Sequence, residues 1–307
     1  MSDTAPAPVA AVARGGAINL VGAVVYGASN FVVLVVLNHS LGVEQAAVVV
    51  VAIALFNVVS TVAALGCTTG LVRTISRLRA IDEPERLHAT LRVALGPVLV
   101  VSCAAAVAVA AAAPALAEIL ADGSTVAEVA RVLRWMAPFI PLATLHTVVI
   151  QGTRGFDTMV PVVAVERIGR AVALPAVIVV ATAAGTGPTG AAAAWAATNA
   201  VALVFSLRAM TSRMDRALSV SGRDPVAADS TFRRAYWRFT APRAVGQASE
   251  VAVNWSDTII VSALVSTTAA GMSTRPSLPA TQPPARRRSF ATSDSVDFSC
   301  RAARSAC

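Results

Sequence analysis

The sequence predicts an all-α, multi-pass membrane protein. Its 307 residues are 56% hydrophobic and their mean hydropathy is +0.67, whereas ordinary soluble proteins contain about 45–50% apolar residues. Uncharged apolar runs cover 17–37, 46–65 and 93–113. Each is long enough to form a membrane-spanning helix, because roughly 20 apolar residues cross the hydrocarbon core. These observations together predict a bundle of membrane helices.

Seven helices are predicted, over 17–37, 46–66, 93–113, 132–150, 160–184, 189–209 and 240–265. The amino terminus lacks the basic segment and short apolar run of a cleavable signal, so the first helix is expected to be retained. Pro138 and Pro141 fall inside the fourth helix and should kink it. The GTGPTG turn at 185–190 lacks the Lys-Ser/Thr ending of a phosphate-binding loop.

The distribution of basic residues predicts the orientation. All 25 are arginines, and they concentrate after the second, fourth and sixth helices, over 73–92, at Arg154 and over 208–238. The connections on the opposite side hold only Arg131, with Arg134 just beyond it. By the positive-inside rule the amino terminus is therefore cytoplasmic. We interpret the net charge of +8 as topology control, and expect no nucleic-acid partner.

The seventh helix carries a polar face. Its polar residues are spaced by four, three, four and three: Arg243, Gln247, Glu250, Asn254 and Asp257. A carboxylate at the membrane centre raises the free energy of helix insertion by about 2.5–3.5 kcal/mol, whereas each aliphatic residue lowers it by only about 0.3–0.6 kcal/mol. Two interpretations stay open: a proton- or cation-responsive site at Glu250 and Asp257, or a polar contact that holds the bundle together.

The first two helices also carry polar side chains. Asn19, Tyr26 and Asn30 share a face of the first helix, and Asn57 lies on the second. They either line one side of a central cavity or form hydrogen bonds between helices.

The arginine, histidine and cysteine residues outside these polar faces show no pattern typical of an enzyme. Arg14 and Arg73 lie at predicted cytoplasmic helix ends. Their guanidinium groups either bind a pyrophosphate or fix the orientation of the helices in the membrane. The three histidines are scattered and the four cysteines have no paired spacing. We therefore expect no catalytic residues, no metal site and no cofactor, and nothing indicates an enzyme.

Several segments resemble polysaccharide-export flippases. These segments are the SLGVEQ turn after the first helix, LGCTTGLVRTISR after the second, QGTRGFDTMVPVVAVERIGR between the fourth and fifth, and PRAVGQASEVAVNWSDTIIVSALVS. Such flippases belong to the multidrug/oligosaccharidyl-lipid/polysaccharide exporter superfamily, which includes O-antigen and lipid II flippases. The resemblance covers about residues 14–271.

The resemblance implies two six-helix lobes that flip an undecaprenyl-diphosphate-linked saccharide by alternating access across the bacterial cytoplasmic (inner) membrane. It makes Arg14, Arg73 and Arg243 candidate phosphate contacts, and Asp257 looks like an acid found in that helix of relatives. The implied partners are the lipid-linked saccharide, membrane lipids, and a polysaccharide polymerase or a second copy.

This chain also departs from the family pattern, which weakens any substrate assignment. Asn38 and His39 stand where a basic residue is usual, and Ala46 and Ala47 replace the usual aromatic-Gly pair. Two alternatives remain: a drug/cation antiporter of the same superfamily, and a membrane scaffold subunit without transport.

The predicted organisation is one six-helix lobe plus the first helix of a second lobe. Its parts are a cytoplasmic segment (1–15), the lobe (16–209), a basic cytoplasmic loop (210–239), the seventh helix (240–265) and a Ser-, Pro- and Arg-rich tail (271–307). The tail is too polar to fold and is expected to be disordered. It is either genuine or the product of a frameshift or truncation that removes the second lobe.

Overall fold

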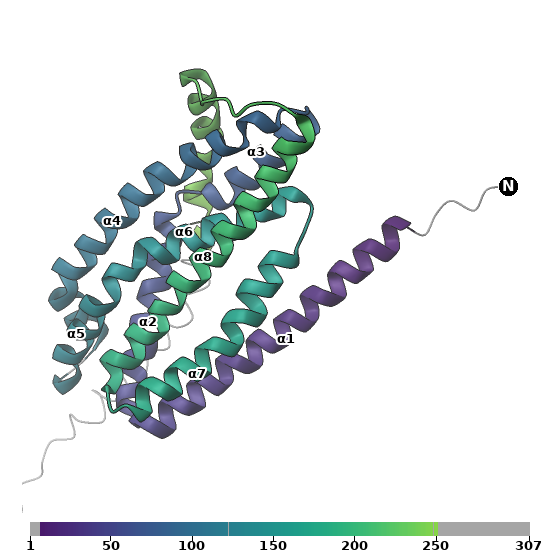
Figure 1. Ribbon diagram of the computed structural model, residues 1–307. Coiled ribbons are helices and arrows are strands. Elements are labelled where there is room, and N and C mark those ends of the chain that lie inside the picture. Colours follow the sequence, from purple (N-terminus) through teal and green to yellow (C-terminus); the bar gives the residue numbers. More distant parts are fainter. Residues whose placement is uncertain (1–6, 122, 248, 251–307) are drawn as a thin grey trace, which may run out of the picture. The chain divides into compact units, whose positions relative to one another are not determined.

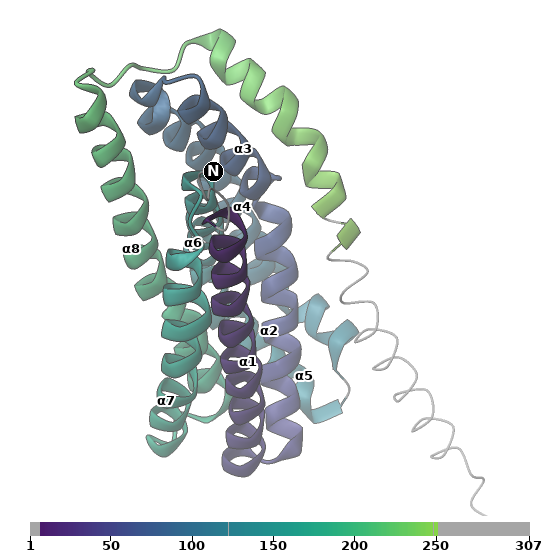
Figure 2. The same ribbon diagram turned by 90° about the vertical axis from the view of Figure 1, so that its right-hand side faces the viewer.

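The computed structural model describes residues 7–121, 123–247 and 249–250, with side chains from residue 20 onward. This part is almost entirely helical and contains no strand (Figures 1 and 2), which confirms the all-α prediction. The α-helices are α1 (Ala7–Leu41), α2 (Val43–Ala63), α3 (Cys67–Ala80), α4 (Leu87–Leu120), α5 (Val126–Met136), α6 (Ile140–Gly152), α7 (Arg170–Ala183) and α8 (Gly187–Ser221).

Short helical turns connect or extend these helices. Four are 3₁₀ turns, η1 (Pro84–Arg86), η2 (Gly123–Thr125), η3 (Ala137–Phe139) and η4 (Thr153–Phe156). The element η5 (Val162–Gly169) is a π-helix that leads directly into α7. A further helical run covers 230–247.

Five stretches of the described part are long and apolar enough to cross a membrane. They are Leu20–Leu41, Val43–Ala63, Pro84–Leu120, Gly123–Phe156 and Gly187–Ser221. The run formed by η5 and α7 matches the predicted fifth helix in length, but it carries Glu166, Arg167 and Arg170 in its first half. It packs along α1, as Figure 2 shows.

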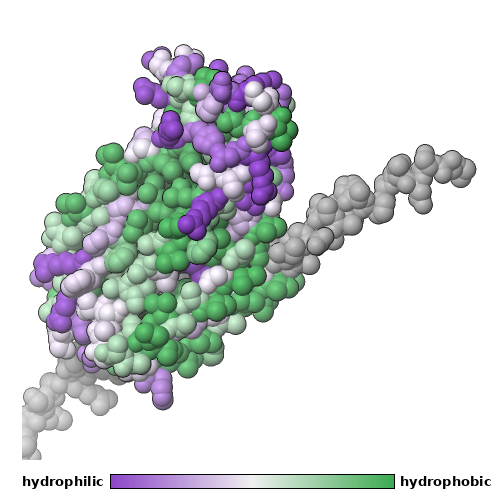
Figure 3. Space-filling view, viewed as in Figure 1, coloured by the Kyte–Doolittle hydropathy of each residue, from purple (hydrophilic) through white to green (hydrophobic). Residues whose placement is uncertain are grey.

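The surface of this bundle has large exposed apolar side chains and one hydrophilic end. Large apolar side chains such as Phe31, Val100 and Val107 are about two-thirds exposed, as suits contact with lipid. Hydrophilic residues gather at the end that holds α3 and the carboxyl end of α8 (Figure 3). This arginine-rich end carries the arginines of α3, of the carboxyl part of α8 and of the 230–247 helix.

The predicted boundaries need three corrections. The fourth predicted helix is broken into α5 and α6 by the 3₁₀ turn η3, because Pro138 and Pro141 cannot complete the α-helical hydrogen-bond ladder. The connection after the second helix is not a loop but contains α3. The sixth helix continues to Ser221, and the next helix begins at residue 230 rather than 240.

Helix α3 packs through an apolar stripe. Leu71, Ile75 and Leu78 recur at helical spacing and are buried, whereas Arg73 and Arg77 point outward. On one side α3 meets the end of α6 so closely that a Cβ on Gly152 would lie 2.3 Å from Leu71 Cδ2. The side chain of Leu71 would therefore have to move to accommodate a larger residue at this position.

A second contact of α3 is with the 230–247 helix. A Cβ on Gly66 would lie 2.6 Å from the Thr240 carbonyl oxygen, and one on Gly70 would lie 2.3 Å from Thr240 Oγ1. Gly66 also has a φ of +74° as the residue before α3, a conformation that other residues rarely adopt. The side chain of Gln247 donates a hydrogen bond to Thr68 Oγ1. Small residues thus hold the start of the predicted seventh helix against α3.

Candidate functional site

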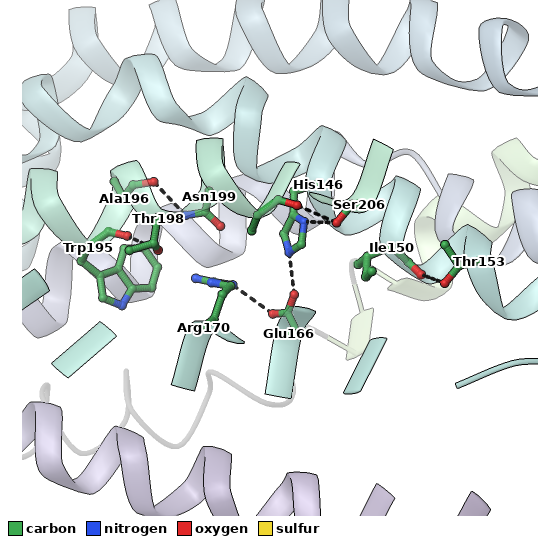
Figure 4. A network of polar contacts seen from close by, with 11 residues as sticks. His146, Ile150, Thr153, Glu166, Arg170, Trp195, Ala196, Thr198, Asn199 and Ser206 are labelled. Carbon is green, nitrogen blue, oxygen red and sulfur yellow. Dashed lines mark hydrogen bonds and ion pairs between the residues drawn. The ribbon is translucent and has the colours of Figure 1, made fainter. Parts of the chain in front are cut away.

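A buried polar network lies inside the bundle, between α6, η5 and α8 (Figure 4). We call it the His146 network; its members are His146, Glu166, Arg170 and Ser206. His146 Nε2 lies 2.6 Å from Glu166 Oε2, and His146 Nδ1 lies 2.9 Å from Ser206 Oγ. Arg170 Nη1 donates to Glu166 Oε1 over 2.9 Å. Each carboxylate oxygen of Glu166 therefore has its own cationic or imidazole partner.

Burial makes this network energetically demanding. His146 and Ser206 are 0% exposed, and the side chains of Glu166 and Arg170 are 26% and 12% exposed. An ionised group held away from water is stable only when it is paired and hydrogen-bonded. The close contacts of Glu166 satisfy that condition.

Aromatic side chains lie beside the network, next to Arg170. The Arg170 guanidinium carbon lies 5.8 Å from the Trp195 ring centroid, a distance at which the ring quadrupole attracts a cation. Trp195 in turn meets Phe56 of α2 edge to face.

The local backbone places Glu166 in this setting. Glu166 lies within the π-helix η5, whose wider turn changes the direction in which its side chains project relative to an α-helix. The short π-helical segments found in proteins occur frequently at functional sites.

A second group of charged residues lies at the arginine-rich end. We call it the Phe239 cluster; its members are Arg73, Phe239 and Arg243. The guanidinium carbons of Arg73 and Arg243 lie 3.6 and 3.9 Å from the centroid of the Phe239 ring. Within the described residues neither arginine has a carboxylate partner. Two cations thus meet at one aromatic ring without a neutralising anion.

A cavity of about 300 Å³ adjoins the Phe239 cluster. Its wall includes Arg73, Arg77 and Phe239. The acids of the wall are already engaged, since Glu83 pairs with Arg86 and Asp229 accepts a hydrogen bond from a backbone amide. The wall holds three arginines, Arg73, Arg77 and Arg86, against these two acids, so its net charge is positive. A larger groove of about 1000 Å³ lies nearby, between α4, α8 and the 230–247 helix, and is lined by Arg92, Arg233 and Arg234 among others.

The structure brings together only some of the residues that the sequence singled out. Arg73 and Arg243 meet, as described, although 170 positions separate them in the chain. Tyr26 and Asn30 are exposed on α1, and Asn57 is half-buried on α2. They belong neither to the Phe239 cluster nor to the His146 network.

The remaining predicted site residues lie at or beyond the edge of the described part. Arg14 and Asn19 fall within α1, but their side chains are outside the described residues. Glu250 is exposed. Asp257 lies outside the described residues, as do the second half of the predicted seventh helix and the tail. The roles of these residues stay predictions.

The sequence reasoning missed the His146 network. Three histidines scattered over the chain suggested no pattern, because spacing cannot show that His146 meets residues 20 and 60 positions away. A usable signal was present, however. Glu166 and Arg170 lie four positions apart in a helix whose only other charged residue is Arg167, and ionisable residues at such positions commonly have a function.

Within the described residues, a bundle that has five helical stretches long and apolar enough to cross a membrane, together with ionisable groups in its interior, has the features of a multi-pass membrane transporter. Comparison with known families agrees. The MatE family model matches residues 20–179, just over half of the chain, so the protein belongs to the MatE family. That family is part of the multidrug/oligosaccharidyl-lipid/polysaccharide exporter superfamily, whose MatE members are transporters. No curated protein and no solved structure is significantly similar to the chain.

Proposed function

We propose that this protein carries an undecaprenyl-diphosphate-linked saccharide across the bacterial cytoplasmic membrane, with its amino terminus in the cytoplasm. The observation that carries the proposal is the Phe239 cluster. In the part of the chain that the structure describes, Arg73 and Arg243 approach the same ring without a carboxylate partner, an arrangement that an anion between or beside them would stabilise. Guanidinium groups suit phosphate oxygens because they donate two parallel hydrogen bonds.

Charge argues against the alternative cargo. A drug/cation antiporter moves positively charged compounds, which the unpaired arginines beside the 300 Å³ cavity would repel. A diphosphate carries negative charge and would be attracted to the same wall. The arginine-rich end is also the end that the positive-inside rule assigns to the cytoplasm, where a lipid-linked saccharide is made before export.

The remaining alternative, a scaffold without transport, makes a different prediction. Loss of a transporter leaves the lipid-linked saccharide in the cytoplasmic leaflet. Loss of a scaffold instead changes glycan length or the assembly of a partner polymerase. The buried, charged His146 network favours transport, because ionisable residues inside membrane bundles commonly mark substrate or ion paths.

The test measures anion binding and translocation by the full chain. In nanodiscs, undecaprenyl diphosphate should raise the melting temperature of the wild-type protein, and Arg73→Gln or Arg243→Gln should reduce that increase. Arg216→Gln is the matched control, because Arg216 is exposed on α8 at the same end but outside the Phe239 cluster.

Translocation is then followed in vesicles that contain a fluorescent lipid-linked saccharide. The two cluster variants should slow its movement while the control variant does not. Stabilisation by cationic dyes such as ethidium, but not by undecaprenyl diphosphate, would overturn the proposal in favour of the antiporter.

A further inference from the structure

Three members of the His146 network, His146, Glu166 and Ser206, can be fully hydrogen-bonded in two ways. In the first, the imidazole is neutral: Nε2–H donates to Glu166 Oε2 over 2.6 Å, and Nδ1 accepts the Ser206 hydroxyl hydrogen over 2.9 Å. In the second, the Ser206 hydroxyl turns and donates to the Ala202 carbonyl, 2.8 Å away. Ser206 Oγ is then free to accept a hydrogen bond from Nδ1–H.

The two arrangements differ by one proton. The second requires hydrogen on both ring nitrogens, so a hydronium ion has given a proton to the lone pair of Nδ1 and become a water molecule. In neither arrangement is a polar atom of His146, Glu166 or Ser206 left without a partner. A buried group normally resists protonation because one of the two states leaves it unsatisfied. Here the rotation of one hydroxyl removes that obstacle.

From this geometry we propose that His146, Glu166 and Ser206 form a proton-binding site within the lobe, in addition to the acids predicted on the seventh helix. The carboxylate of Glu166 lies where the added positive charge develops, at 2.6 Å from Nε2. Arg170 holds the other oxygen of the same carboxylate and keeps it ionised by its charge. The network is neutral before protonation and carries one positive charge afterwards.

Other charges have little direct access to the imidazole. Helices α2, α3, α4 and α8 also pack against α6, and every charged residue on them is exposed or half-buried. These residues are Glu44, Arg73, Arg77, Arg79, His88, Arg92, Glu118, Arg208, Arg213, Asp215 and Arg216. Arg154 and Arg167, on η4 and η5, are half-buried. The charged groups bonded to the site include Glu166, which touches His146, and Arg170, which touches Glu166.

Protonation of His146 would act on the backbone through the π-helix η5. Glu166 sits in the π-helix η5, and η5 packs against α1 through Gly22, where a Cβ would lie 3.0 Å from Arg167 Cδ. A change in the attraction between His146 and Glu166 thus acts on an irregular helix that adjoins α1. In a transporter, such a change would couple proton binding to helix movement, and this role rests on the proposed function.

Proton binding itself is tested without transport. The chain has only three histidines, so nuclear magnetic resonance of the full chain in nanodiscs with isotope-labelled histidine gives a simple spectrum, and His146→Gln identifies the relevant signals. We expect the His146 ring to change from the Nε2–H tautomer to the doubly protonated form as the pH is lowered. In Glu166→Gln the midpoint should fall by about one pH unit, a tenfold loss of proton affinity.

The matched control is His88→Gln. It removes the other described histidine–carboxylate contact, between His88 Nε2 and Asp215 Oδ1 at 3.0 Å, and should leave the His146 titration unchanged. A His146 ring that keeps one protonation state at every pH at which the protein stays folded would overturn the proposal, as would an unchanged midpoint in Glu166→Gln. Titration as expected together with failure to move the lipid-linked saccharide would support the proton site and refute the proposed cargo instead.

Discussion

Replacing Gly70 by alanine should weaken the contact between α3 and the 230–247 helix. The new methyl group would lie 2.3 Å from Thr240 Oγ1, 2.8 Å from Cγ2 and 3.1 Å from Cβ. All three distances are shorter than ordinary contact, and a β-branched side chain has few rotamers to escape into. The helices must therefore separate by roughly an ångström or less, and overpacking of this kind costs about 1–3 kcal/mol.

A second glycine serves as a control that separates the free-energy cost of overpacking from the intrinsic helix preference of alanine. Gly96 lies within α4, and a Cβ there would have no neighbour within 4 Å. Both substitutions gain the same helix propensity, up to about 1 kcal/mol, so that contribution cancels in the comparison. The free energy of unfolding of Gly70→Ala should thus be lower than that of Gly96→Ala by about 1–3 kcal/mol.

The assay is reversible unfolding in mixed detergent micelles, followed by circular dichroism. Thr240→Ala removes both atoms that lie closest to the new methyl group, so the double variant should recover most of the lost stability. Equal unfolding free energies for Gly70→Ala and Gly96→Ala would show that the helices are not in the close contact described here. Absence of recovery in the double variant would show that the loss has another origin.

Three further predictions concern charge and topology. Arg170→Gln leaves the Glu166 carboxylate with one partner fewer and should lower the free energy of unfolding by about 1–3 kcal/mol. The loss should be smaller in a Glu166→Gln background, and unfolding of the single and double variants measures both values. Burial raises the pKa of the Cys67 thiol, on α3 outside the membrane-crossing stretches, from 9.0 to about 11. The folded state therefore holds this proton more tightly, and stability should decline as the pH rises from 9.0 to about 11, a decline that Cys67→Ala should reduce. Reporter fusions after Asp224 should be cytoplasmic and those after Gly185 external; the reverse pattern would contradict the predicted orientation.

The sequence predicted the helices better than their contacts. Long apolar runs identify membrane helices because the hydrocarbon core demands about 20 apolar residues in succession. Helix α3 escaped this criterion since half of its residues are polar, although Leu71, Ile75 and Leu78 show the 3.6-residue period of an amphipathic helix. The stacking of Arg73 and Arg243 on one ring depends on how α3 meets a helix far along the chain, and helix-forming patterns do not contain that information.

The two sites are joined by close packing at α3. Gly152, six residues after His146 in the chain, lies against Leu71 of α3, while Gly70 on the same helix lies against Thr240. Contacts this close leave no free volume in which one helix could move without its neighbour. A shift of α6 that follows proton binding would therefore reach α3 and, through it, the Phe239 cluster.

The Gly70→Ala variant tests the two ends of this chain of contacts separately. It should alter the stabilisation by undecaprenyl diphosphate and leave the His146 titration in place, because the contact it disturbs lies beyond α3 from the proton site. If it instead shifted the titration and left diphosphate binding unchanged, α3 could not be the element that links the two sites.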